Sequence, residues 1–206
     1  MNVIIGCEES GVGRRIFQAK GHTATSCDIK PARDGDTFWH WQGDIVAYLE
    51  GVEDGYYDLG IFHPECTTVC VAGNRTYAPG GIPTKARTDQ IDWIVNLWLL
   101  AERKCKRIAF ENPASVIFPV LRSMGADVQY VQPWQHGHME QKKTGLALWN
   151  LPRLTETKNV YDEMMKLPRK ERERIHFMSP GKNRSRDRSE SYTGILEAMA
   201  DQWGSL

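Results

Sequence analysis

The chain has 206 residues, 41% of them hydrophobic and 25% charged, which predicts an ordinary globular protein with a real core. Its 26 lysine and arginine residues balance 26 aspartate and glutamate residues, so no global positive field indicates a nucleic-acid partner, although a local patch stays possible. No apolar run approaches the ~20 residues of a membrane span, and the first residues lack a signal-peptide pattern. Five cysteines without a framework spacing predict free thiols in a reducing, cytoplasmic setting.

Strand and helix patterns alternate along the first 150 residues. We expect strands at 2–5, 23–29, 56–62 and 107–110, helices at 11–21, 86–105 and 116–125, and a final strand pair at 127–133 and 146–150. The clearest helix is 86–105, because Ile91, Ile94 and Trp98 recur at helical spacing. This order predicts a mostly parallel α/β sheet with helices on both faces.

The composition changes after Pro152. Residues 156–177 are highly charged and indicate a solvated linker or exposed helix, whereas the Ser/Arg-rich residues 179–192 predict a loop and 194–203 a closing helix. In that loop basic residues occupy every second position, which suits either a solvated loop or a path along a phosphate backbone; they are Lys182, Arg184, Arg186 and Arg188. We expect one domain over 1–206, with a connection at about 153–192 and a C-terminal helix.

Acidic residues follow the first strands at the end where such sheets bind ligands. After the first strand comes GCEESGVG, whose glycines allow a tight turn beside the free N–H groups of the next helix. Glu8 and Glu9 would repel a pyrophosphate, so we expect a ligand without phosphates, for which S-adenosylmethionine is suited. Asp28, about 20 residues on, could accept ribose hydroxyls, and Asp44 could meet an adenine amino group; alternatively, both are ordinary loop acids.

A cysteine and a glutamate follow the next two strands, in GIFHPECTTVC (60–70) and ENP (111–113). A thiolate beside a carboxylic acid suits methylation of cytosine at C5. Addition of the Cys66 thiolate to C6 makes C5 nucleophilic, and the Glu111 carboxyl group at N3 stabilises the adduct. Pro64 and Pro113 are expected to stiffen the two loops, because proline fixes φ and restricts its neighbour.

The ordered motifs resemble those of the DNA cytosine-5 methyltransferases over nearly the whole chain, and most closely those of small phage-type members. IIGCEESG is similar to the cofactor loop of that family, HPEC to its Pro-Pro-Cys nucleophile loop and ENP to its Glu-Asn-Val motif. QKKT stands where the family has a basic Gln-x-Arg-x-Arg motif, and SYTGILEAMADQW resembles the last motif, which completes the cofactor pocket.

The resemblance implies a Rossmann-like methyltransferase sheet in one catalytic domain, S-adenosylmethionine as cofactor and cytosine-containing DNA as partner. It implies that Cys66 is the nucleophile, that Glu111 contacts N3 and that Lys143 replaces the first arginine of the basic motif. Implied cofactor contacts are Gly6, Glu8, Ser10, Gly11, Asp28, Ile29, Asp44, Ile45 and Pro64, and implied substrate contacts are Asn112, Arg75 and Gln141.

Two departures from the family pattern bear on activity. Glu65 replaces the second proline of Pro-Pro-Cys, and a carboxylate facing the thiol would raise the pKa of Cys66, whereas an exposed or paired one would matter little. Only about 40 residues separate QKKT from the last motif, and none of them predicts a folded target-recognition domain. We therefore expect low sequence specificity, a short target or a protein partner for recognition.

Two other functions fit parts of the sequence. His63 and Glu65 have the His-x-Glu form of zinc deaminases, with Cys66 and Cys70 near, but the chain lacks their Pro-Cys-x-x-Cys. The second alternative is a catalytically impaired methyltransferase-like protein that binds DNA or a partner. Retention of four residues argues against it, because such a protein has no chemical need for all of them: Cys66, Glu111, Asp28 and Asp44.

Overall fold

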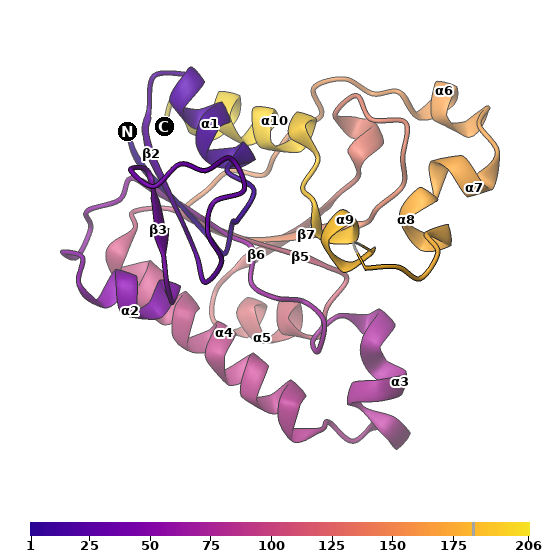
Figure 1. Ribbon diagram of the computed structural model, residues 1–206, viewed down its shortest axis with the longest axis horizontal. Helices are drawn as coiled ribbons and strands as arrows, with labels where there is room; N and C mark the ends of the chain where they lie inside the picture. The colour runs from indigo at the N-terminus through magenta and orange to yellow at the C-terminus, as the bar shows by residue number, and fades with distance from the viewer. Residues whose placement is uncertain (183) are drawn as a thin grey trace.

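A computed structural model describes residues 1–182 and 184–206, in which seven strands form a sheet with helices on both faces (Figure 1). The strands are β1 (Asn2–Gly6), β2 (Thr23–Asp28), β3 (His40–Gln42), β4 (Leu59–Phe62), β5 (Ile108–Pro113), β6 (Asp127–Val131) and β7 (Thr144–Trp149). Their order across the sheet is β3-β2-β1-β4-β5-β7-β6. The first five pair in parallel, whereas β7 inserts antiparallel between β5 and β6.

Helices cover the two faces unequally. The larger ones are α1 (Val12–Ala19), α2 (Ile45–Glu50), α4 (Lys85–Lys104), α5 (Ile117–Ser123) and α10 (Thr193–Trp203). Figure 1 shows α1 and α10 together over one face, and α2, α4 and α5 over the other. The sequence predicted α1, α4, α5 and α10, as well as the β6–β7 pair.

Successive strand residues belong alternately to the two halves of the core, as the period of a strand requires. Val3, Ile61 and Leu146 pack with α10, whereas Ile4, Phe62 and Ala147 pack with α4 and α5. Within one strand, residues two positions apart therefore face the same side of the sheet, and we say that such residues have the same parity. This rule also governs the polar residues at the strand ends.

Two elements near the sheet edge were missed from the sequence. β3 has the polar sequence HWQ and only one neighbour, β2, so it carries no alternating apolar signal. The six-residue α2 is too short to show a helical period; its N-cap is Asp44, whose side chain accepts bonds from the amides of Val46 and Ala47. Both elements lie beside the carboxyl end of β2.

The charged region 153–192 contains short helices. For 156–177 the sequence left open a solvated linker or an exposed helix, and for 179–192 it predicted a loop. The helices are α6 (Tyr161–Met165), α7 (Arg169–Arg172), α8 (Arg174–Phe177) and α9 (Arg184–Ser189). The loop expected at 179–192 is thus wrong for α9, because a helix of polar residues lacks the apolar spacing that would reveal it. Asn183 and the side chain of Arg186 lie outside the described residues.

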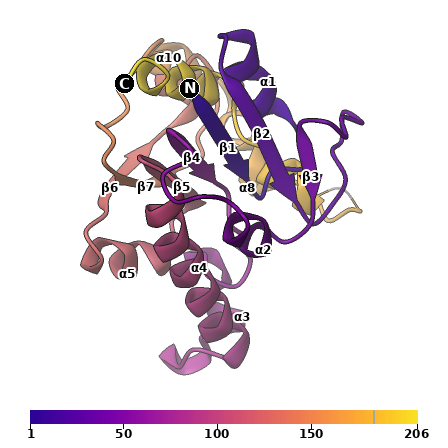
Figure 2. The same cartoon turned by 90° about the vertical axis from the view of Figure 1, so that its left-hand side faces the viewer.

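The short helix α3 (Asn74–Tyr77) projects from the rest of the fold. It follows the cysteine loop, which we define as residues 63–73, and Figure 2 shows it beside the end of α4 that lies farthest from the sheet. No helix among the described residues combines the length and the apolar character needed to cross a membrane. All five cysteines are free.

Candidate active site

The loop after β1 turns its first carboxylate into the protein. Glu8 is 7% exposed, and its Oε1 accepts bonds from Gly13 N at 2.6 Å and Ser10 Oγ at 3.0 Å, while Oε2 accepts one from Arg14 N at 3.4 Å. Glu8 therefore satisfies the free amides at the start of α1, as an N-cap side chain would. It does not point outward as the sequence suggested, and neither Glu8 nor Ser10 presents a free side chain to a ligand.

The second carboxylate of this loop is also engaged. Glu9 pairs with Arg33 at 2.9 Å and with Lys30 at 3.2 Å. Burial raises the pKa of Glu9, but hydrogen bonds and charges from Arg33 and Lys30 outweigh it, so the pKa lies below its ordinary value. The positive charges of Arg33 and Lys30 therefore offset the negative charge of Glu9, which was expected from the sequence to repel a phosphate group.

Two of the glycines of this loop, Gly6 and Gly11, have little room for a side chain. A Cβ on Gly6 would lie 2.4 Å from Phe62, and one on Gly11 would lie 2.4 Å from Asp34 Oδ2. Gly11 also has φ +68°, a conformation that other residues adopt at a cost. The loop therefore keeps its backbone close to the carboxyl ends of the strands.

The end of β2 presents a carboxylate beside an apolar side chain. Asp28 is half-buried, and its Oδ1 accepts a bond from Lys30 N at 2.9 Å. Burial and the charge of Glu9 raise the pKa of Asp28 against the lowering effect of Lys30. The next residue, Ile29, is 71% exposed. A carboxylate and an exposed aliphatic side chain together suit a nucleoside, whose sugar is polar and whose base is flat.

The corresponding residues after β3 are used differently. Asp44 is exposed, but its Oδ1 caps α2 through Val46 N at 2.9 Å and Ala47 N at 3.0 Å. Ile45 is 3% exposed and packs in the core beside Gly6. Of these two predicted contacts, only Asp44 has a side chain at the surface.

The cysteine loop is tied to the end of β5. The Asn112 amide donates to the Pro64 carbonyl at 2.9 Å, and Val116 N donates to the Val69 carbonyl at 3.0 Å. Pro64 and Asn112 are both buried. The Asn112 Oδ1 atom has no hydrogen-bond partner among the described residues. Asn112 therefore serves first to hold the cysteine loop, rather than to meet the substrate with a free amide nitrogen.

A buried arginine on α4 also holds this loop and was missed from the sequence. Arg87 is 3% exposed and donates from Nε to the Thr68 carbonyl at 2.7 Å and from Nη1 to Asn74 Oδ1 at 2.8 Å. Its Nη2 reaches the Cys70 carbonyl at 3.4 Å. An arginine in the polar first turns of a helix gave no signal in the sequence, because only the folded loop supplies its acceptors.

Cys66 and Glu111 lie at neighbouring carboxyl ends, since β4 and β5 pair in parallel. The pKa of the half-buried Cys66 thiol is raised to about 11, first by burial and then by the adjacent Cys70 and Glu111, while Lys142 lowers it. Glu65 is exposed, and its carbonyl accepts a bond from Gln90 Nε2 at 3.3 Å. Burial, rather than Glu65, keeps the thiol protonated.

We therefore expect Glu65→Gln to leave the pKa of Cys66 unchanged and Glu111→Gln to lower it. Alkylation of Cys66 measured against pH tests this. Below the thiol pKa of about 11, the rate of the wild type should rise about tenfold per pH unit, because only the thiolate reacts. A profile of Glu65→Gln displaced to lower pH would contradict the assignment to burial.

Strand parity selects three polar residues that face α10. His63 continues the parity of Ile61, Glu111 that of Ala109, and Lys142 that of Leu146. His63 Nδ1 lies 2.9 Å from Glu111 Oε2, and the two side chains are 13% and 15% exposed. Burial raises the pKa of Glu111, but the His63 hydrogen bond and the charges of His63 and Lys142 bring it below its ordinary value. Parity could have indicated His63 and Lys142 beforehand.

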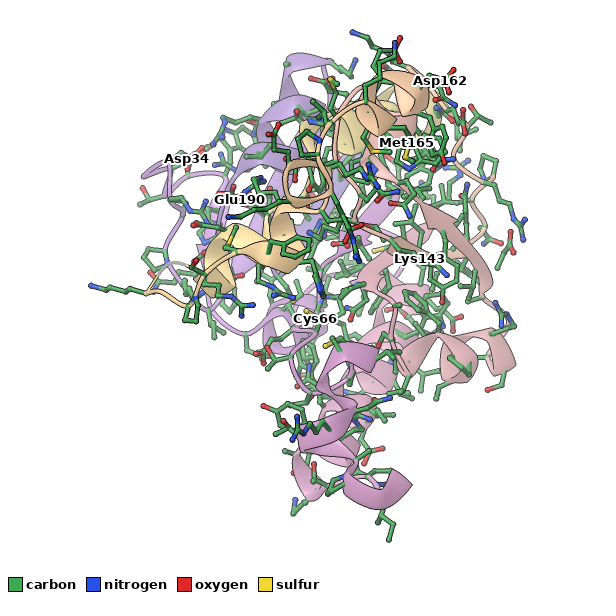
Figure 3. The ribbon with its side chains drawn as sticks, turned by 90° about the vertical axis from the view of Figure 1, so that its right-hand side faces the viewer. Asp34, Cys66, Lys143, Asp162, Met165 and Glu190 are labelled. Carbon is green, nitrogen blue, oxygen red and sulfur yellow. The ribbon has the colours of Figure 1, made fainter. Side chains whose placement is uncertain are left out.

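The adjacent lysine lies on the opposite face. Lys143 is exposed, with Nζ 4.2 Å from the centre of the Tyr130 ring, and Figure 3 labels its position relative to Cys66. Gly145, of the same parity, packs against Phe118 and Tyr130. Lys142, not Lys143, is therefore the lysine whose charge acts on both Cys66 and Glu111.

Two of the predicted substrate residues lie outside this cluster. Arg75 is exposed on α3 and makes no hydrogen bond or ion pair with the described residues. Gln141 is half-buried, and its backbone N–H donates to the Arg172 carbonyl at 2.6 Å. Neither lines the pocket described next.

A small pocket joins the strand ends to α10. His63, Glu111, Lys142 and Thr144 line one side, and the other side is formed by Ser191, Tyr192, Ile195, Leu196 and Met199. Glu190 bridges its rim, because its carboxylate pairs with Arg33 at 2.5 Å and its carbonyl accepts from Lys142 Nζ at 3.1 Å (Figure 3). The loop near β2 and the cysteine loop thus border one region.

No group of three or more histidine, cysteine, aspartate or glutamate side chains in residues 1–182 and 184–206 is placed to hold a metal ion. His63 and Cys66, which suggested a zinc deaminase, therefore belong to no such group among these residues.

Comparison with known proteins identifies the fold. No family model matches the chain, and no curated protein matches it. An Entamoeba histolytica methyltransferase, EhMeth, is similar in structure, with a TM-score of 0.52 and 13% identity over 77% of this chain and 57% of its own. A Spodoptera frugiperda DNMT2 mutant gives a TM-score of 0.47 and 10% identity over 77% and 54%.

A protein from an Escherichia coli prophage, described as a DNA modification methyltransferase, gives a TM-score of 0.46 and 16% identity over 82% of this chain and 56% of its own. The chain thus spans little more than half of the length of each of these three neighbours. With the strand order and the antiparallel β7, the likeness to EhMeth carries the conclusion. The chain has the Rossmann-like fold of the S-adenosylmethionine-dependent methyltransferases.

Proposed function

We propose that this chain is a DNA cytosine-5 methyltransferase that uses S-adenosylmethionine. The observation that carries the proposal is the meeting of Cys66 and Glu111 at adjacent strand ends, close enough for the carboxylate to raise the pKa of the thiol. A nucleophilic sulfur and a carboxyl group at one edge of the sheet suit a base whose C6 is attacked while N3 is protonated.

In the proposed reaction the Cys66 thiolate forms a bond to cytosine C6 while Glu111 delivers a proton to N3. The ring then becomes nucleophilic at C5. S-adenosylmethionine, when bound, supplies the methyl group. The C5 proton then passes to water, cleavage of the S–C6 bond restores the thiolate and the aromatic ring, and N3 returns its proton to Glu111. Lys142, rather than Lys143, is assigned to stabilise the anionic groups, because it lowers the pKa of both Cys66 and Glu111.

The residues around the ends of β1 and β2 fit this cofactor. Asp28 would hold the ribose hydroxyls and Ile29 would pack on the adenosine, with the backbone of Gly6 and Gly11 allowing a close approach. Asp44 and Pro64 remain assigned to the cofactor side, whereas Glu8, Ser10 and Ile45 act through the loop and core that they support.

We expect Asp28→Ala to weaken binding of S-adenosylhomocysteine by about 1.5–3 kcal/mol, through loss of a charge-assisted hydrogen bond. Calorimetry on the folded protein measures this change. Asp54→Ala is the matched control, since Asp54 is an exposed acid that pairs with Lys104 away from the strand ends. Equal affinities for Asp28→Ala and the wild type would remove Asp28 from the cofactor site.

The substrate assignment is tested in DNA. Cells that express the wild type should accumulate C5-methylcytosine, detected by mass spectrometry of nucleosides, and cells that express Cys66→Ala should not. Among the described residues of 153–192 the regular elements are the short helices α6–α9, so we propose low sequence specificity or a protein partner for target recognition. Equal C5-methylcytosine in both cultures would contradict the proposal.

The second candidate is a methyltransferase-like protein that binds DNA without turnover. A thiol pKa of about 11 favours it, because little thiolate exists at neutral pH. Such a protein would bind S-adenosylhomocysteine and DNA while the C5-methylcytosine content stays at the level of Cys66→Ala.

A further inference from the structure

A histidine and a glutamate at the strand ends are in direct contact and have no assigned joint role. His63 Nδ1 and Glu111 Oε2 are 2.9 Å apart, and both side chains are largely buried. His63 follows β4, and its amide donates to the Gly6 carbonyl at 3.0 Å, which fixes the backbone from which the imidazole projects. Parallel pairing of β4 with β5 places Glu111 beside it.

The groups around the pair come from three other segments. Lys142, before β7, and Tyr192, at the start of α10, line the same pocket. Cys66 lies in the cysteine loop, and the charge of Glu111 raises the pKa of its thiol. Lys142 favours the charged carboxylate, whereas the thiolate of Cys66 would disfavour it.

The proposed chemistry requires a proton that Glu111 alone holds poorly. Although burial raises the pKa of Glu111, His63 and Lys142 lower it below its ordinary value. At neutral pH Glu111 is therefore a carboxylate in this setting, which can accept a hydrogen bond but cannot protonate N3. A protonated His63 imidazole, whose Nδ1 lies 2.9 Å from Glu111 Oε2, would be placed to supply that proton.

Building on the proposed function, we infer that His63 holds the proton that Glu111 delivers to the base ring. The His63 Nδ1–H bond breaks as the carboxyl group gains the proton, and the carboxyl group passes it to N3 as the Cys66 S–C6 bond forms. When that bond breaks, N3 returns the proton along the same path, so none is consumed. His63 acts through Glu111 and is a positioning residue.

His63→Asn separates the proton from the hydrogen bond. The asparagine amide can donate to Glu111 from nearly the same place, but it has no proton to release at neutral pH. We expect single-turnover methyl transfer at pH 7.5 to fall about 100-fold, with unchanged S-adenosylhomocysteine affinity. The loss should shrink as the pH falls, because Glu111 then gains a proton from solvent. His176→Asn, on the exposed α8, is the control.

Wild-type rate and pH profile in His63→Asn would overturn the inference and leave His63 as a structural hydrogen-bond donor. A second readout needs no turnover: the Glu111 carboxyl carbon is titrated by NMR in the ligand-free protein. Removal of the histidine in His63→Asn should raise the pKa of Glu111, and an unchanged titration would overturn the pairing. If the wild type transfers no methyl group, the proposed function fails, and the titration alone decides whether the two residues share a proton.

Discussion

Replacement of Arg87 by methionine is expected to lower the free energy of unfolding by about 2–4 kcal/mol and to loosen the cysteine loop. The guanidinium is 3% exposed and bonds to Thr68, Cys70 and Asn74. Methionine fills a similar volume but donates no hydrogen bond, so the Thr68 carbonyl and the Asn74 side chain lose the donors that tie the loop to α4. Chemical denaturation gives the stability change, and limited proteolysis reports opening near the cysteine loop.

Arg103→Met is the matched control on the same helix. Arg103 is 63% exposed and has an ion pair at 3.5 Å with the exposed Asp54, so its loss should cost no more than about 0.5 kcal/mol. Equal destabilisation by the two substitutions would show that the buried bonds of Arg87 do not hold the loop.

Substitution of Lys142 by methionine is expected to reduce methyl transfer by about 100-fold, whereas Lys143→Met should change it little. The Lys142 charge lowers the pKa of Cys66 and of Glu111, so its removal raises both. Each unit by which the Cys66 pKa rises removes about nine-tenths of the thiolate available at neutral pH. Lys143 faces Tyr130 on the other side of the sheet.

The same pair of variants can be examined without substrate. Lys142→Met should displace the alkylation profile of Cys66 to higher pH, and the profile of Lys143→Met should coincide with that of the wild type. The reverse result would restore Lys143 to the role that the sequence motif implies.

The fold could be predicted because its signals are local. Apolar runs marked β1, β4 and β5, and helical spacing marked α4. β3 and α2 are too short to carry such a period. The order of the motifs along the chain was also enough to place Cys66 and Glu111 at one edge of the sheet, since parallel neighbours end together.

The detailed site depends on contacts between distant segments, and these could not be predicted from local patterns. From the sequence, Glu8 is expected to be an exposed acid. In the fold, the free amides at the start of α1 donate to its carboxylate. From the sequence, Glu65 could raise the pKa of the Cys66 thiol. In the fold, the side chain of Glu65 is exposed. The choice between Lys142 and Lys143 depends on how β7 pairs with β5, a long-range fact.

Because β7 runs antiparallel to β5, Thr144 lies opposite Pro113, and the residues before β7 arrive at the edge where Glu111 stands. Counting back from Thr144, the second residue faces α10 and the first faces Tyr130. A single-residue insertion directly after Lys143 would make Lys143 the second residue before Thr144, so that it faces α10 and a cation remains there. Deletion of either lysine would give that place to Gln141, which is uncharged. The charge beside the thiol is thus encoded in the number of residues before the strand as much as in their identity.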